Sequence, residues 1–305
     1  MKIIDISGFG HSGKTAVSDL FREVKGVEAH DHSFEFGLLR LPDGILELEE
    51  ALCGNWSPVR SDRAIKRFRR ICNILNDGYS NNLCKTFLKD SEQYIESLVD
   101  DRLWVDGWFD GLYDGYNQGK TKEILKKFNL LNLACNLRKI FPEKKLSSCR
   151  KSEVFLSGGV DFKHKTKKFL EKILFCYTRK ESKFVLTNNM LEPFSPSSGI
   201  SFFEDAVCIV VQRDPRDIFA SVKNYEHSFV PDFEEKNKIY SKEYLKNLKQ
   251  DMLGSENLSS FITRQKIYND KTILSNESDR IIRIKYEDLV LNYDDTVKKL
   301  FSQLG

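Results

Sequence analysis

Long apolar runs are absent from this sequence. In its 305 residues, no stretch approaches the roughly eighteen consecutive apolar residues of a membrane-spanning helix. An excess of charge of one sign is also absent, because 48 Lys or Arg are matched by 45 Asp or Glu, and this balance argues against general nucleic-acid binding. We expect that the first residues are not a signal peptide, since Lys2 is followed by Asp5 and the chain enters a strand at once. We therefore expect a cytoplasmic protein, and no feature of the sequence indicates its oligomeric state.

The cysteines lack the spacing of a metal site. No C-x-x-C pair and no His–Cys ligand spacing occurs, so we expect no zinc and no other metal. The seven cysteines are Cys53, Cys72, Cys84, Cys135, Cys149, Cys176 and Cys208. An odd, unpatterned set of this kind predicts reduced thiols in a reducing compartment.

A glycine-rich segment follows the first apolar run. Residues 8–15, GFGHSGKT, fit the phosphate-binding pattern G-x-x-x-x-G-K-[ST] at every fixed position. A loop between a first strand and a first helix turns backbone N–H groups and the helix dipole toward an anion. The candidate binding residues are Gly10, His11, Ser12, Gly13, Lys14 and Thr15. The pattern predicts a phosphate site but leaves open which nucleotide it serves.

Apolar runs of strand length alternate with segments of helical periodicity. The expected strands occupy residues 2–7, 26–36, 183–187, 206–212 and 281–286. Buried strands that alternate with helices form a parallel sheet covered on both faces. The sequence therefore predicts an α/β fold with a P-loop-type parallel sheet flanked by helices. We expect a single domain over residues 1–305, with a largely helical insertion at about 45–150.

A second motif, VVQRDPRDIFAS, begins where the run at 206–212 ends. Asp214 would hold a metal ion if the protein were a kinase or nucleotide hydrolase. Another interpretation covers the segment better: Asp214 is a helix N-cap, with Pro215 at the first helical position. Arg213 would then stand at the carboxyl edge of the sheet and Ser221 about two turns into the helix. Both would converge on one phosphate, Arg213 through charge-assisted bonds and Ser221 through its hydroxyl.

Together the two motifs resemble those of sulfotransferases that use 3′-phosphoadenosine-5′-phosphosulfate (PAPS). Arg213 and Ser221 match the family's R-x-x-x-x-x-x-x-S element for the 3′-phosphate. The segment RDPRDIFAS is close to the sequence common in bacterial and carbohydrate sulfotransferases. The late stretch RIIRIKYEDLVLNYDDTVKKLFSQLG is similar to the family's closing strand and helix. The resemblance implies in-line transfer of a sulfuryl group from PAPS, without a metal, to a hydroxyl or amine of a glycan or small-molecule acceptor.

The chain departs from the family pattern in two places. The family's donor loop carries its basic residue at the position of His11, whereas the lysine comes later here, as Lys14. The resemblance therefore implies that His11 and Lys14 share that role. Many relatives also place donor-binding residues beyond the closing helix, and this sequence stops at Gly305. We expect that it is a fragment or that the donor is held with fewer contacts.

A general base must also take the acceptor's proton, and AHDHSFEFG offers three candidates. Glu35 is favoured because it would point to the carboxyl edge of the sheet if it ends the strand. His32 is the second choice, and a structural role for His30, His32 and Glu35 stays open. A downstream aromatic group would either stack on a sugar or, more commonly, pack in the core. It consists of Trp104, Trp108, Tyr113 and Tyr116.

Two other functions compete with sulfuryl transfer. The intact G-K-T sequence and Asp214 favour a P-loop kinase or nucleotide hydrolase that uses Mg-ATP, and a nucleotide-binding regulatory module without chemistry is the third possibility. Residues 144–183 contain twelve Lys or Arg against four acids, which fits either an anionic ligand nearby or a solvated helix face.

Overall fold

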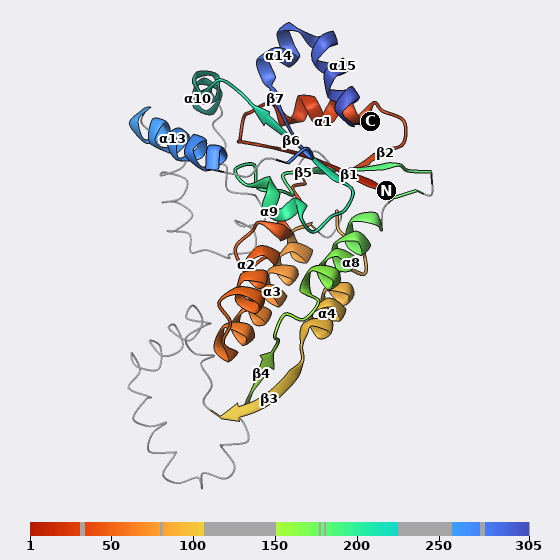
Figure 1. Cartoon of the computed structure of the whole chain (residues 1–305), viewed down its shortest axis with the longest axis vertical. Coiled ribbons are helices and arrows are strands. Elements are labelled where there is room, and N and C mark those ends of the chain that lie inside the picture. The colour runs from red at the N-terminus through yellow and green to blue at the C-terminus, as the bar shows by residue number, and fades with distance from the viewer. Residues whose placement is uncertain are drawn as a thin grey trace.

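A five-stranded parallel sheet lies between two groups of helices (Figure 1). The computed structural model describes residues 1–30, 34–79, 82–106, 151–176, 178–179, 181–224, 258–274 and 278–304. The strands are β1 (Lys2–Gly8), β2 (Val27–Ala29), β5 (Phe184–Asn188), β6 (Ala206–Gln212) and β7 (Ile281–Lys285). Their order is β2-β5-β1-β6-β7, and every pair in it is parallel. The predicted α/β fold is confirmed.

Alternation along the strands gives the sheet two apolar faces. Ile4 and Ile6 of β1 belong to one core, together with Val17 and Phe21, whereas Ile3 belongs to the core of the opposite face. The first face is covered by α1 (Lys14–Arg22), α14 (Tyr286–Leu291) and α15 (Tyr293–Leu304) (Figure 1). Successive strand side chains point to opposite faces, so a strand buried on both sides is an unbroken apolar run.

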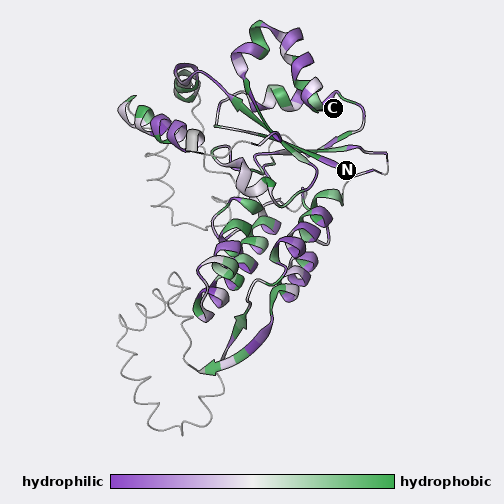
Figure 2. Cartoon of the chain, in the orientation of Figure 1, coloured by the Kyte–Doolittle hydropathy of each residue, from purple (hydrophilic) through white to green (hydrophobic). Residues whose placement is uncertain are grey.

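The second face rests on a layer of amphipathic helices. Figure 2 shows that these helices carry both apolar and polar residues, as expected of helices with one buried face. The elements are η1 (Gly37–Leu39), α2 (Ile45–Glu49), η2 (Glu50–Gly54), α3 (Pro58–Tyr79), α4 (Phe87–Leu98), α8 (Phe162–Phe175) and α9 (Pro196–Ile200). Tyr94 of α4 stacks on Phe169 of α8 with ring centroids 4.5 Å apart, which ties these two helices together.

Two strands lie outside the central sheet. β3 (Asp101–Asp106) and β4 (Lys151–Leu156) pair antiparallel at the end of the helical layer that lies away from the sheet (Figure 1). Trp104 of β3 is 64% exposed, so its ring is not part of the core. The other predicted aromatics, Trp108, Tyr113 and Tyr116, lie outside the described residues, as does much of the expected insertion.

The remaining helices are α10 (Pro215–Asn224) and α13 (Leu258–Leu274). Of the helices that the structure describes, none combines the length and the apolar character needed to cross a bilayer. The predicted strand at 26–36 was wrong in length, because β2 covers only Val27–Ala29. Residues 34–36 have left the sheet, and Phe34 and Phe36 pack instead into the core beneath it.

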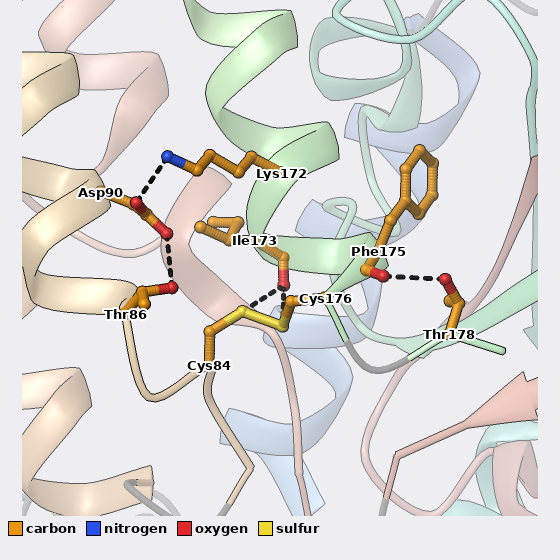
Figure 3. The surroundings of a disulfide bond; sticks show 8 residues. All are labelled: Cys84, Thr86, Asp90, Lys172, Ile173, Phe175, Cys176 and Thr178. Carbon is orange, nitrogen blue, oxygen red and sulfur yellow. Dashed lines mark hydrogen bonds and ion pairs between the residues drawn. A yellow bond between two sulfur atoms is a disulfide. The ribbon is translucent and has the colours of Figure 1, made fainter.

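A disulfide joins Cys84 to Cys176, so the expectation of seven reduced thiols was wrong for this pair (Figure 3). Cys84 precedes α4 and Cys176 follows α8, and these two helix ends meet because the helices pack side by side. Nearby, Lys172 of α8 pairs with Asp90 of α4 at 2.6 Å. The cysteines are 92 residues apart in sequence, so no local spacing could have indicated the bond.

Candidate active site

The carboxyl edge of the sheet brings together three segments that are distant in sequence. Gly8 ends β1, Asn188 ends β5 and Gln212 ends β6, and these strands are neighbours in the order β5-β1-β6. All three run parallel, so their carboxyl ends meet. Ligands of open α/β sheets bind in the crevice outside this edge.

Residues 8–15, the phosphate loop, turn sharply from β1 into α1. His11 and Gly13 adopt left-handed backbone conformations, with φ of 63° and 91°. A side chain on Gly8 would meet the Ser12 hydroxyl at 2.5 Å and the Val211 carbonyl at 2.7 Å, so a glycine is required there. The loop therefore passes close to β6, and the N-terminus of α1 at Lys14 lies at the same edge, where its dipole favours an anion.

Lys14 turns its ammonium toward the beginning of the phosphate loop. Its Nζ donates to the Gly8 carbonyl at 3.2 Å and lies 3.5 Å from Glu35 Oε1. The side chain is only 13% exposed, and burial lowers the pKa of the Lys14 ammonium below its usual value, while the Glu35 carboxylate opposes that shift. A desolvated cation beside the N-terminus of a helix attracts an anion more strongly than an exposed one.

His11 connects the phosphate loop to the second motif. Its Nδ1 lies 3.0 Å from Ser221 Oγ, and its carbonyl oxygen accepts a hydrogen bond from Arg213 Nη1 at 3.1 Å. Burial, with the positive charges of Arg213 and Lys14, lowers the pKa of the His11 imidazole. The structure thus brings together the two motifs, which the sequence places about two hundred residues apart.

Tyr286 is a member of this group that the sequence analysis missed. Its ring lies against Gly13, where an added side chain would come within 2.2 Å of the ring, and the Arg213 guanidinium lies 4.8 Å from the ring centroid. Tyr286 thereby fixes the phosphate loop and Arg213 relative to each other. The available signal was its place at the end of the run at 281–286, since that position reaches the same edge of the sheet.

Comparison with known families identifies the family of the chain. The model of the sulfotransferase domain family matches residues 142–305, more than half of the chain and including both Arg213 and Ser221. The chain belongs to the sulfotransferase family. It is therefore an enzyme that transfers a sulfuryl group from PAPS to an acceptor. No curated protein matches the chain at the level of a clear relative.

The described residues fit this donor, although the phosphate loop precedes the matched segment. Ser12 Oγ and Arg213 Nε are both buried, and neither has a hydrogen-bond partner among the described residues. A buried polar group without a partner is costly, so both atoms are available to hydrogen-bond a ligand. One belongs to the phosphate loop and the other to the second motif, in keeping with the two phosphate-bearing ends of PAPS.

Asp214 of the sulfotransferase caps a helix. Its Oδ1 accepts a hydrogen bond from the Arg216 backbone N–H at 2.8 Å, and its carbonyl accepts from Asp217 and Ile218 in the first turn of α10. The Arg216 side chain lowers the pKa of the Asp214 carboxyl to about 2. This geometry bears out the N-cap interpretation and leaves the carboxylate engaged with Arg216, which disfavours its use as a metal ligand.

Glu35 lies beside the phosphate loop, but it does not end a strand as the sequence analysis supposed, because β2 ends at Ala29. Its carboxylate accepts hydrogen bonds from Arg40 Nη2 at 2.8 Å and Asn189 Nδ2 at 2.7 Å, and Lys14 approaches it at 3.5 Å. The second candidate, His32, lies outside the described residues. His30 packs its ring edge-on against Phe34, with centroids 5.1 Å apart, and its carbonyl oxygen accepts a hydrogen bond from Arg22.

Proposed function

We propose that the enzyme transfers the sulfuryl group to a hydroxyl or amine of a glycan or small-molecule acceptor, in the manner of bacterial and carbohydrate sulfotransferases. The likeness of RDPRDIFAS to the motif of those enzymes supports the acceptor class. The junction at His11 is the observation that carries the donor site on which the transfer depends. One residue of the phosphate loop contacts both Arg213 and Ser221, so the loop and the motif predicted for the 3′-phosphate form one site.

We assign the residues of this site to the two ends of PAPS by their charge and position. Arg213 and Ser221 would hold the 3′-phosphate, and Gly10, Ser12, Gly13 and Thr15 would line the 5′ side with Lys14. PAPS supplies the activated sulfuryl group, which passes in line to the acceptor oxygen or nitrogen. Lys14 stabilises the negative charge that grows on the phosphate side, and His11 provides a proton donor there. One preorganised donor of this type lowers the activation barrier by about 3–4 kcal/mol.

Glu35 would act as the general base. Its side chain is 39% exposed, so an acceptor can reach it, yet three neighbours fix its carboxylate next to the phosphate loop. Hydrogen bonds from Arg40 and Asn189 hold the carboxylate in one orientation, and a base must stand at a fixed place within reach of the proton that it takes.

Ligand binding with and without a divalent metal tests the donor site. We expect adenosine 3′,5′-bisphosphate to raise the melting temperature in the presence of EDTA, and Mg-ATP to raise it little. The Lys14→Ala variant should lose most sulfuryl transfer with or without added magnesium. Stabilisation by Mg-ATP alone, with activity that vanishes in EDTA, would instead indicate a kinase or nucleotide hydrolase.

Transfer of labelled sulfate from PAPS to a panel of sugars, phenols and amines tests the acceptor class. Turnover on sugars or on another small hydroxyl or amine supports the proposal. Binding of the bisphosphate without turnover on any member of the panel would favour the regulatory module.

A further inference from the structure

Asn189 follows β5 in an uncommon backbone conformation. Its φ of 47° is left-handed, a region that few residues other than glycine adopt without a compensating interaction. Two backbone hydrogen bonds hold it there: its N–H donates to the Ile6 carbonyl at 3.0 Å, and its own carbonyl accepts from Arg40 Nε at 2.7 Å. The residue is only 7% exposed, so its side chain is surrounded by protein atoms and not by solvent.

The side-chain amide of Asn189 joins the phosphate loop to Glu35. Its Oδ1 accepts a hydrogen bond from the Gly8 N–H at 3.2 Å, and its Nδ2 donates to Glu35 Oε1 at 2.7 Å. These partners fix the orientation of the amide, because the Gly8 N–H can only donate and an ionised carboxylate can only accept. Both ends of the amide are therefore used within the site.

A buried carboxylate anchors the turn that carries Asn189. Asp5 of β1 is fully buried and accepts hydrogen bonds from the backbone N–H groups of Met190 at 2.9 Å and Leu191 at 3.1 Å, and from the Thr187 hydroxyl at 2.8 Å. Burial raises the pKa of the Asp5 carboxyl, and these hydrogen bonds oppose the shift. The turn is thus fastened to the strand that leads into the phosphate loop.

Three charged groups surround Glu35 besides the neutral amide. Lys14 from α1 and Arg40 after η1 are cations, and Glu192 lies close enough to feel the charges of Arg40, Glu35 and Lys14. Burial raises the pKa of the Glu192 carboxyl. Asn189 therefore contributes a hydrogen-bond donor to Glu35 without adding a further charge to this balance.

We propose that Asn189 is a positioning residue, which sets the Glu35 carboxylate at a fixed place relative to the phosphate loop and keeps it ready to accept a proton. This inference rests on the proposed role of Glu35 as the base. Asparagine suits the position on three counts: it tolerates the left-handed backbone, its oxygen holds the Gly8 N–H, and its nitrogen holds Glu35.

Two substitutions at this position separate these contributions. Asn189→Asp keeps an oxygen for the Gly8 N–H but turns a second carboxylate toward Glu35, and a carboxylate beside another retains its proton to higher pH. Asn189→Gly keeps the left-handed backbone and removes the amide. Asn73→Asp, on α3, makes the same chemical change at an exposed residue whose amide donates to the Arg69 carbonyl, and serves as the control.

The experiment measures kcat and KM against pH for these variants and for Glu35→Gln, with circular dichroism and bisphosphate binding as checks of folding. We expect Glu35→Gln to lower kcat by about 100-fold or more while bisphosphate affinity is retained. In Asn189→Asp the acidic limb of the kcat profile should move to higher pH by about one unit. Asn189→Gly should move the acidic limb by less than Asn189→Asp does and should lower kcat. Asn73→Asp should have the kcat and the pH profile of the wild type.

The possible failures are distinct. If Glu35→Gln keeps wild-type turnover, both the base assignment and the role of Asn189 fall. If Glu35→Gln is inactive while Asn189→Asp and Asn189→Gly keep the wild-type acidic limb, Glu35 stands as the base and only the positioning role is overturned. Should Asn189→Asp fail to fold, the profile of Asn189→Gly decides, because glycine meets the backbone requirement at this position.

Discussion

Arg213 holds a central place at the scale of single residues. It donates to the His11 carbonyl, lies over the Tyr286 ring and keeps a buried Nε without a partner among the described residues. We predict that Arg213→Ala weakens binding of adenosine 3′,5′-bisphosphate more than tenfold, because a charged hydrogen bond contributes about 1.5–3 kcal/mol. Calorimetry measures this. Arg216→Ala, which removes an exposed guanidinium three residues later, is the matched control, and equal affinities in both folded variants would contradict the assignment.

His11 gives a second prediction at this scale, from the direction of its pKa. Because burial, Arg213 and Lys14 lower that pKa, the positively charged imidazolium form becomes the major form only at a pH below the usual value of 6.5. If the protonated form assists the leaving phosphate, the turnover deficit of His11→Ala relative to wild type grows as the pH falls. Sulfate transfer from pH 5 to 8 (about the range in which an imidazole titrates) tests this, with the exposed His164→Ala as control. Identical profiles for His11→Ala and wild type would reduce His11 to a spacer.

At the scale of elements, the junction of the phosphate loop with α14 depends on Gly13. Gly13→Ala places a methyl group in a left-handed backbone and also against the Tyr286 ring, 2.2 Å from its nearest atom. Gly26 is a matched control: it has φ of 89°, but no atom lies closer than 3.8 Å to an added side chain. Gly26→Ala should therefore lose only the backbone contribution, about 1–2 kcal/mol.

We predict that urea denaturation shows a loss in the free energy of unfolding for Gly13→Ala that is at least twice the loss for Gly26→Ala. The double variant Gly13→Ala/Tyr286→Ala should lose less than the sum of its single variants, since the ring that causes the contact is gone. A loss in Gly13→Ala no greater than that in Gly26→Ala would mean that α14 moves aside freely, and the tie between Tyr286 and the loop would fall.

At the scale of the whole molecule, the disulfide fastens the helical layer beneath the sheet. It closes a segment of 92 residues that runs from the start of α4 to the end of α8. Removing a crosslink of this kind lowers stability by about 2–4 kcal/mol. We predict that dithiothreitol, or Cys84→Ser with Cys176→Ser, lowers the melting temperature by several degrees, whereas Cys53→Ser, at an exposed free thiol, changes it little.

Peptide mapping under non-reducing conditions checks the bond directly. If both cysteines are found as free thiols and dithiothreitol leaves the melting temperature unchanged, the reduced state expected from the sequence is correct instead. The cytoplasmic location stays a prediction, and this measurement bears on it because disulfides are rare in cytosolic proteins.

The sequence by itself determined the features that local pattern encodes. Apolar runs marked β1, β5, β6 and β7 to within about a residue, the G-K-T pattern marked the loop before α1, and Asp214-Pro215 marked the beginning of α10. Each of these depends on residues that are neighbours in the chain, so spacing and propensity were sufficient. The run at 26–36 was misread because the turn of Phe34 and Phe36 into the lower core is a packing effect, which local pattern does not contain.

Only the tertiary structure decided which distant residues meet. His11 contacts Ser221, Asn189 contacts Glu35, and Cys84 contacts Cys176, across 210, 154 and 92 residues. Such contacts follow from the order of the strands and from the packing of α4 on α8, which are settled by the burial of apolar surface over the whole chain. A motif indicates which chemistry a segment can perform. The strand order β5-β1-β6 brings the segments of this site to one edge of the sheet.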